Sequence, residues 1–249
     1  CSEGSPESFN PQLVTSGTTI DAVSQQLYNR LVKINPDTGK VISDLARKVI
    51  VSSDGMRYRF YLRKGVQFHS TEYFTPTRTL TSEDILFTFS RFLNADHPYH
   101  MVNGGQYAFF NSVGLDKIIE QIIVVDDLTI EFRLTDPQAS FLANLATDFA
   151  VILSAEYGDY LLSNNTPELI DQKPVGTGPF KFKEYKRDHY IRYLKHEHYW
   201  QSMSELEQIV FDITPNNSTR LAKFITQECD VLGYPSASDV GFLQQREGV

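Results

Sequence analysis

The chain has 249 residues, of which 41% are hydrophobic and 12% aromatic, so it has enough apolar material to bury a substantial core. Lys and Arg number 23 against 31 Asp and Glu, and the resulting formal net charge of -8 argues against nucleic acid as a partner. No apolar run approaches the roughly 20 residues that a membrane-spanning helix needs, which excludes a transmembrane segment.

The N-terminal third predicts a helix, then a hairpin, then a second helix. The first helix is expected over 19–32 with Thr18 or Thr19 as its N-cap. Asp54-Gly55 lies between two β-prone runs and predicts a hairpin turn. The apolar positions that repeat at helical spacing in the first helix are Ile20, Val23, Leu27 and Leu31.

The remaining two thirds mix helices and strands without the regular alternation of a doubly wound sheet, so a mixed α+β fold is expected. Turn residues, capping residues and β-branched runs mark each element. The first of these are a capping box at Thr81 to Asp84 and a hairpin of 118–125 and 129–134 that turns at Asp126-Asp127. Next come a helix that Pro137 opens and that carries Phe141, Leu142 and Leu145, and a short helix capped by Thr166-Pro167. The last are strands at 180–185, 189–195 and 207–213 and a helix at 217–227.

Two glycine motifs lack the features of phosphate-binding loops. Gly39-Lys40 has neither the upstream Gly nor the following Ser or Thr of a Walker A loop, so it is interpreted as part of a turn. The 176–178 Gly-Thr-Gly run is followed by Pro179, which has no amide to donate to a pyrophosphate. No Gly-x-Ser-x-Gly elbow or Ser-x-x-Lys pair is present, so the sequence offers no local sign of serine-nucleophile chemistry.

Histidine pairs are the remaining metal-ligand candidates, and both are weak. His196 and His198 would share one face of a strand, and His97 and His100 lie in a Pro-containing loop. Neither pair has a third ligand nearby in the sequence. We therefore expect these to be ordinary surface and loop histidines and assign no metal site.

Two other clusters have a structural interpretation beside a functional one. Adjacent carboxylates at Asp126-Asp127 imitate a catalytic dyad, but such residues on a hairpin turn are normally solvated. Tyr107, Phe109 and Phe110 are interpreted as core or loop anchors in preference to a stacking platform. No catalytic constellation is assigned.

Cys1 and Cys229 are the only cysteines, and their spacing fits no zinc or redox motif. The chain begins without Met, which is typical of a processed or trimmed chain. On these residues alone, Cys1 is a lipid-modified first residue, half of a disulfide with Cys229, or a free thiol. The first two states predict a location outside the cytoplasm.

Taken in order, a series of motifs resembles one family, the extracytoplasmic solute-binding proteins of peptide ABC importers. The similarity is to the dipeptide-binding, haem-binding and Sap branch, and it runs from residue 1 to about 245, with a lean toward the Sap members linked to antimicrobial-peptide resistance. The resemblance to the family rests on Cys1 to Gln12, Ser16 to Thr19, Tyr28 to Leu31, Tyr58 to Val66, Phe68-His69, Phe74 to Arg78, Pro174 to Phe180 and Glu228 to Asp230. The preference for the Sap members rests on Phe211 to Ile213, Thr219 to Lys223 and Leu232 to Ser236.

The resemblance implies an α/β fold, the first lobe of a type II periplasmic binding protein-like architecture. Family members are about twice as long, so the second lobe is expected to lie outside this chain. Within the lobe, 1–34 and 165–249 are expected to form the ligand-side part and 35–164 an inserted subdomain. The resemblance also implies a disulfide between Cys1 and Cys229.

The implied function is that of a periplasmic substrate-binding protein delivering short or cationic antimicrobial peptides to an ABC transporter. The implied partners are a peptide ligand and an inner-membrane ABC permease, with the protein a monomer, not an enzyme, and without a cofactor. Haem is the alternative cargo within the family. Alternatives from other classes are an assembly or chaperone module and a secreted hydrolase.

For the ligand site, the resemblance suggests that the loop of Thr15, Ser16, Gly17 and Thr18 faces the cleft. Gly17 would allow close backbone approach, and the hydroxyls would hydrogen-bond peptide amides. The alternative for this loop is simple capping of the following helix. Tyr107 is a further cleft candidate, and the charged anchors for the peptide termini are expected in the second lobe.

Overall fold

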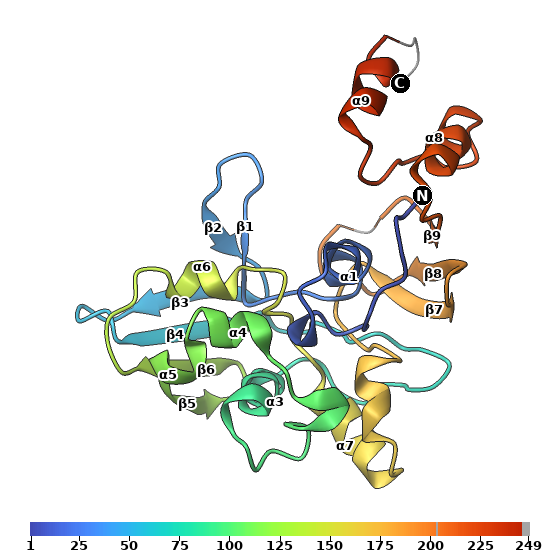
Figure 1. The fold of residues 1–249 in the computed structure, drawn as a ribbon. Coiled ribbons are helices and arrows are strands. Elements are labelled where there is room, and N and C mark those ends of the chain that lie inside the picture. The colour runs from blue at the N-terminus through green and yellow to red at the C-terminus, as the bar shows by residue number, and fades with distance from the viewer. Residues whose placement is uncertain (203, 246–249) are drawn as a thin grey trace.

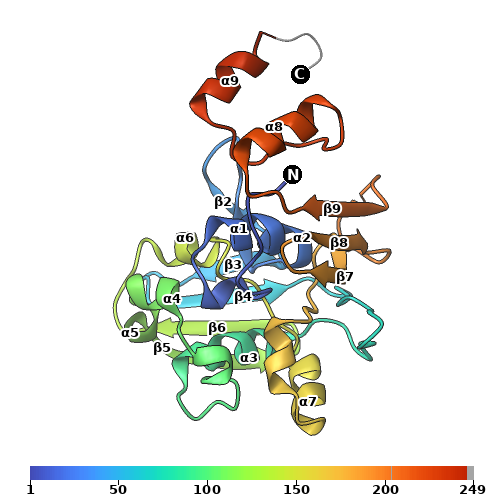
Figure 2. The same ribbon diagram turned by 45° about the vertical axis from the view of Figure 1, so that its right-hand side comes forward.

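The computed structural model describes residues 1–202 and 204–245 and has a mixed α/β architecture, as expected (Figure 1). In that part of the chain no helix is long and apolar enough to cross a membrane. A four-stranded sheet lies at one side of the molecule and a three-stranded sheet at the other, with two C-terminal helices projecting beyond them (Figures 1 and 2).

The four-stranded sheet is antiparallel, with the strand order β3-β4-β6-β5. The two predicted hairpins are its β3–β4 and β5–β6 pairs. The capping box predicted at Thr81 and Asp84 is formed at the start of α3. The longest helix that accompanies the sheet is α3, with 12 residues. The elements are β3 Ala46–Val51, β4 Arg57–Leu62, α3 Ser82–Leu93, α4 Ala108–Ser112, α5 Leu115–Ile118, β5 Ile119–Asp126, β6 Thr129–Leu134, α6 Phe141–Leu145 and α7 Ala155–Ser163.

The three-stranded sheet, β7-β8-β9, is also antiparallel, and its strands match the prediction to within one residue. The N-terminus joins it, because Ser2 forms a parallel bridge with Ile213 just after β9. The remaining elements are β7 Phe180–Lys186, β8 Tyr190–Lys195, β9 Gln208–Asp212, α8 Asn217–Ile225, α9 Ala237–Leu243, the β1–β2 ribbon of Val32–Ile34 and Val41–Ser43, and 3-10 turns at Pro11–Leu13, Val102–Gly104 and Pro167–Asp171.

The helix predicted over 19–32 is wrong at both ends. It starts at Gly17 with Ser16 as N-cap, passes through a π-helical segment at Ile20–Ser24, and stops at Leu27. Tyr28 is extended (φ -130°, ψ 161°), because the Leu27 carbonyl accepts the Gly178 amide at 2.9 Å. A partner about 150 residues away along the chain thus ends the helix.

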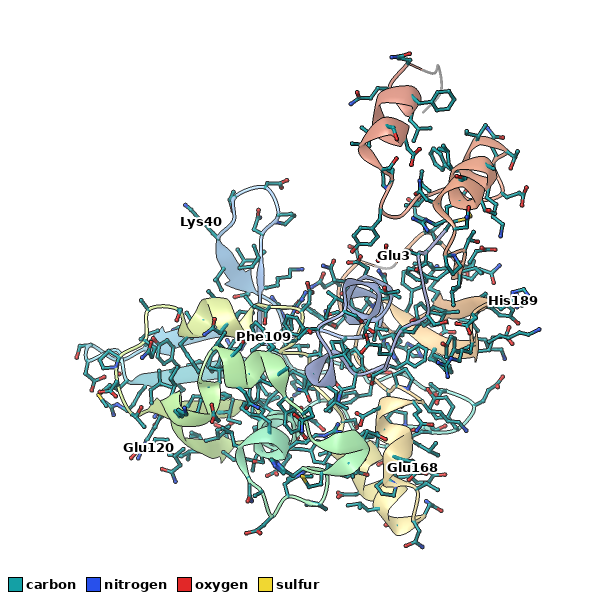
Figure 3. The ribbon with its side chains drawn as sticks, in the orientation of Figure 1. Glu3, Lys40, Phe109, Glu120, Glu168 and His189 are labelled. Carbon is teal, nitrogen blue, oxygen red and sulfur yellow. A yellow bond between two sulfur atoms is a disulfide. The ribbon has the colours of Figure 1, made fainter. Side chains whose placement is uncertain are left out.

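The helix predicted to open at Pro137 begins instead at Phe141, since Ser140 is its N-cap and the Phe141 amide closes a turn onto the Gln138 carbonyl at 3.2 Å. The short helix after Thr166 exists as a 3-10 turn with Pro167 at its start. The turn predicted around Gly39 links β1 and β2 and has Lys40 at its end (Figure 3).

Buried apolar side chains form two clusters. The larger lies under the four-stranded sheet and includes Phe60, Phe89 and Phe132, each fully buried. The smaller joins the helix at 17–27 to the three-stranded sheet through residues such as Leu27 and Tyr193. The division into 1–34 plus 165–249 and an inserted 35–164 stays a prediction.

Candidate functional site

The loop of residues 15–18 leads into the helix that begins at Gly17. Thr15 and Gly17 are exposed, and Ser16 and Thr18 are half-buried. Ser16 is the N-cap, yet within the described chain its hydroxyl bonds no helix amide and donates instead to Thr19 Oγ1 at 3.0 Å. Thr18 and Thr19 are not the N-cap, so that part of the capping interpretation is wrong.

Contacts to the N-terminal segment hold this loop in place. Thr19 is buried, and its Oγ1 accepts the Glu7 amide at 3.0 Å. Thr18 Oγ1 reaches the Glu3 carboxylate at 3.5 Å, and Glu3 lies beside the first helix in Figure 3. Thr15 and Gly17 remain exposed on this loop.

Gly17 packs against a residue far away in the sequence. A Cβ built on Gly17 would lie 3.1 Å from the hydroxyl oxygen of Tyr234. That hydroxyl donates to the Asp21 carboxylate, and this hydrogen bond raises the Tyr234 pKa to about 12. The absence of a side chain at Gly17 therefore leaves room for the end of the Tyr234 side chain beside the start of the helix.

A groove of about 710 Å³ adjoins the loop and runs along β9. Thr18, Asp21 and Tyr234 line one part of it, and exposed apolar side chains such as Val210 and Val231 line others. Apart from the bridge at Ser2, the outer edge of β9 pairs with no strand in the described residues. The loop therefore borders a roomy surface with both polar and apolar walls.

A disulfide joins Cys1 and Cys229, with Cα atoms 5.6 Å apart, which confirms the pairing implied by the resemblance. The Cys1 carbonyl also accepts the Gly233 amide at 3.0 Å. Together these bonds tie the segment carrying Tyr234 to the N-terminus and so to the candidate loop. The structure leaves neither cysteine free.

The 176–178 Gly-Thr-Gly run serves close backbone packing. A Cβ on Gly176 would lie 2.0 Å from the Leu27 carbonyl oxygen, and one on Gly178 would lie 2.5 Å from the Leu27 carbonyl carbon. Thr177 between them donates to Asn29 Oδ1 at 3.1 Å. These glycines therefore seat the end of the candidate-loop helix.

The expectation of surface and loop histidines is wrong for His196, which is buried, and the members of each pair have separate structural roles. His196 follows β8, is buried, and binds the Gly178 carbonyl at 3.0 Å, whereas His198 is exposed. His100 donates to the Arg91 carbonyl, and His97 accepts the Tyr99 amide. The one three-residue ligand cluster in the described chain consists of Cys1, Asp212 and Cys229, whose two sulfurs are bonded to each other.

Tyr107 is only 2% exposed, and its hydroxyl contacts a buried ion pair. It lies 3.2 Å from Arg91 Nε and donates to the His100 carbonyl at 2.9 Å. Arg91 in turn binds Asp171 through two hydrogen bonds of 2.7 and 2.6 Å. These contacts place Tyr107 in the interior, and we leave it out of the ligand surface proposed below.

Sequence reasoning missed the network around Asp171. Besides Arg91, its carboxylate accepts from Asn10 and Asn103, both at 2.7 Å. These residues come from four separated segments, and no local spacing connects them.

Asp126 and Asp127 are exposed on their hairpin turn, as expected, where Asp126 accepts the Leu128 amide at 2.9 Å.

Two antiparallel sheets with accompanying helices, and a disulfide that joins the N-terminus to a later segment, define one lobe of a type II periplasmic binding protein. A dipeptide-binding protein from Pseudoalteromonas sp. SM9913, solved in complex with Met-Leu, superposes on it with a TM-score of 0.97 at 50% identity, over 99% of this chain and 49% of that one. The predicted fold class is thereby confirmed.

The chain belongs to the bacterial extracellular solute-binding proteins of family 5, whose middle region matches residues 40–249. It is 49% identical over its whole length to the dipeptide-binding protein of Escherichia coli K12, covering 46% of that relative. Identity is 42% to haem-binding protein A of Haemophilus influenzae and 41% to the peptide transport protein SapA of Salmonella typhimurium, each over 98% of this chain and 45% and 44% of those relatives. The family resemblance is confirmed, and all three predicted branches are represented.

This chain spans about half the length of the relatives that it matches. The match covers their N-terminal part, as the resemblance implied.

Proposed function

We propose that this chain is the first lobe of a periplasmic protein that binds short peptides and delivers them to an inner-membrane ABC permease, with 1–34 and 165–249 as the ligand-side part of that lobe. The observation that carries the proposal is the loop of Thr15, Ser16, Gly17 and Thr18, in which Thr15 and Gly17 are exposed and Thr18 lines the 710 Å³ groove. The N-cap hydroxyl of Ser16 bonds no helix amide in the described chain. The names of the relatives, which include dipeptide-binding and Sap peptide-transport proteins, support a peptide cargo.

Peptides of varied sequence share only their backbone, so a general binder does best to contact peptide N–H and C=O groups. Hydroxyls suit this because each can donate and accept. Gly17 allows the peptide backbone to come close to the start of the helix. Side chains of the cargo would then lie in wide, hydrated space that imposes little selection.

A second lobe would close over this loop by hinge motion, remove water from the peptide and supply charged partners for its termini. The net charge of -8 favours encounter with cationic peptides at long range, and salt screens that effect beyond about 8 Å. Cationic antimicrobial peptides are therefore one cargo to test beside neutral dipeptides.

Isothermal titration of the full-length protein, with both lobes present, with dipeptides, tripeptides, a cationic peptide and haem tests the proposal. We expect binding to at least one peptide class. Binding to haem alone would favour the haem-carrying alternative, for which the relative named haem-binding protein A is the supporting observation. Absence of binding to every ligand would refute a solute-binding role.

Variants of the loop test the site itself. Gly17→Val puts a branched side chain on the exposed loop, with its Cβ 3.1 Å from Tyr234 Oη. The Tyr234 side chain must then shift, a peptide backbone can no longer come close to this position, and peptide affinity should fall. Gly241→Val is the matched control, because a Cβ at Gly241 of α9 meets no atom of another described segment within 4 Å. Equal affinities of both variants for peptide would count against the loop.

We propose no enzymatic activity and a monomeric, periplasmic protein. Peptide turnover abolished by replacing a single His or Asp would support the secreted-hydrolase alternative. A stable stoichiometric complex with another protein, formed without any small ligand, would support the assembly or chaperone alternative.

A further inference from the structure

The four-stranded sheet has one face turned to the core and one turned to solvent. On β4 the side chains of Tyr58, Phe60 and Leu62 are buried, while Arg57 and Arg59 between them are exposed. Because side chains alternate along a strand and cross-strand partners share a face, the register fixes which residues join the arginines on the outer face. The partners are Ile50 of β3 and Glu131 of β6 opposite Arg59, Lys48 of β3 opposite Tyr61, and Arg133 of β6 opposite Arg57.

This outer face is cationic in a chain whose net charge is -8. Among the residues just named, the only carboxylate is that of Glu131, which the surrounding side chains cover so that it is 4% exposed. Arg47, at the bulge beside Lys48, adds a further cation, and both lie 5.9 Å from the centre of the Tyr61 ring. We call this surface, comprising Arg47, Lys48, Arg57, Arg59, Tyr61 and Arg133 around Glu131, the basic sheet face.

Glu131 organises the centre of the basic sheet face. Its Oε2 accepts from Arg59 Nε and Nη2 at 3.0 and 2.7 Å, and its Oε1 accepts from Arg133 Nε at 3.1 Å. The Arg59 and Arg133 side chains nevertheless remain 44% and 45% exposed. Two guanidinium groups are thus held in fixed positions by one carboxylate and still present donors to solvent.

Arg57 and Arg133 lie directly opposite each other on β4 and β6. Like charges in that position repel and destabilise a sheet. Among the described residues, no side-chain hydrogen bond reaches the Arg57 guanidinium. A hollow of about 210 Å³ lies between Arg57, Arg59, Tyr61 and Glu131, with room for an anionic group.

We propose that the basic sheet face is a docking surface for an acidic, extended segment of a partner protein. Arg57 and Arg59 are two residues apart on one strand, so their Cα atoms are about 6.8 Å apart. An extended segment with carboxylates at every second residue has the same repeat. Guanidinium groups bind carboxylates through charge-assisted hydrogen bonds, which suits the fork of Arg57 and the Nη1 amine of Arg59 that Glu131 does not use.

The margins of the face favour a narrow segment over a broad anionic surface such as a lipid bilayer. Asp54 and Glu120 line the hollow of about 300 Å³ on the far side of Arg57 and Arg133. Asp126 and Asp127 are exposed at the end of the β5–β6 hairpin, and Glu120 lies at the β5 margin in Figure 3. A plane of lipid phosphates would meet all of these carboxylates, whereas none of them lines the 210 Å³ hollow over which a single extended chain would lie.

The test measures binding of the purified protein to a fluorescent peptide with four Glu-Thr repeats and to its Gln-Thr counterpart. We expect the Glu peptide to bind at least about tenfold more tightly, and its affinity to fall as NaCl rises to about 150 mM, where the Debye length is about 8 Å. Arg57→Glu should lower that affinity about tenfold or more, and Arg57→Gln should lower it less.

Arg187→Glu is the matched control, since it makes the same charge change at a side chain 84% exposed on the β7–β8 turn, far from the basic sheet face in sequence. We expect it to bind the Glu peptide as the unmodified protein does, and thermal melts check that each variant is folded. Three outcomes would overturn the proposal: no preference for Glu over Gln, equal losses in Arg57→Glu and Arg187→Glu, or binding to phosphatidylglycerol vesicles without binding to the peptide.

Discussion

His69 and His196 meet edge to face with ring centres 4.8 Å apart, and both bind the carbonyl oxygen of Gly178 at 3.0 Å. His69 also accepts the Gly176 amide on Nδ1 at 3.2 Å. Since a carbonyl only accepts and an amide only donates, the bonds of His69 require a neutral ring protonated on Nε2. The two buried imidazoles therefore fasten the glycine run that seats the candidate-loop helix.

Acid should weaken this arrangement. Burial, followed by the neighbouring His196, holds the pKa of His69 well below its ordinary value, and burial also lowers the pKa of His196. Lys181 opposes protonation of both rings, while Glu197 favours it at His196. Because the folded pKa values lie below the unfolded value of about 6.5, the folded state loses stability as pH falls below about 6.5.

The measurement is the melting temperature at about pH 7.5 and about pH 5.5, a window above the ordinary carboxylate range. His69→Gln keeps a donor and an acceptor but does not titrate, so its melting temperature should fall less on acidification. His189→Gln, at an exposed turn position labelled in Figure 3, serves as control and should fall as the unmodified protein does. An unchanged fall in His69→Gln would contradict the prediction.

Gly178→Ala should destabilise the fold strongly. The new Cβ would lie 2.5 Å from the Leu27 carbonyl carbon and 2.6 Å from the Gln26 carbonyl oxygen, and backbone atoms cannot move aside as a flexible side chain can. We expect the free energy of unfolding in urea to fall by about 3 kcal/mol or more. Gly241→Ala, in open space within α9, should instead gain about 0.5–1 kcal/mol. Similar losses in both would show that close packing at Gly178 is unimportant.

Reduction of the Cys1–Cys229 disulfide should lower the melting temperature. The bond closes a loop with a sequence separation of 228, and losing such a bond typically costs about 2–4 kcal/mol. At about 2–4 °C per kcal/mol for a chain of this size, the drop should be easily measured. A variant with both cysteines changed to Ser should not respond to reductant. Two freely alkylated thiols in native, non-reduced protein would rule the bond out.

Asp171→Asn should be costly because Arg91 would remain buried without its counter-charge. Arg91 is fully buried and Asp171 is 2% exposed, and breaking a buried pair by removing one partner costs about 3–5 kcal/mol. Adding Arg91→Met to Asp171→Asn should recover part of that loss, as measured by urea unfolding. Asp159→Asn, on the exposed side of α7, is the control and should cost little. A double variant less stable than Asp171→Asn alone would contradict the argument.

Residues that are close together in the sequence determine several elements of the fold without any tertiary contact. Asp54-Gly55 allows a tight turn because Gly55 takes a positive φ of 71°. Thr81 and Asp84 cap α3 through bonds that span only three residues. Such features depend on neighbours in the sequence, so the pattern alone predicts them, and the ordered family motifs likewise predicted the fold class and the disulfide.

Only the tertiary structure decided where the first helix ends and what Tyr107 does. The apolar spacing through Leu31 continues a helix, but the Gly178 amide takes the Leu27 carbonyl and the chain turns away. Tyr107 is buried because its hydroxyl accepts a hydrogen bond from Arg91 in the interior. The charge of Arg91 is balanced by Asp171, which comes from another segment of the chain. These bonds join residues that are distant in the chain, and their strength depends on burial that no local spacing encodes.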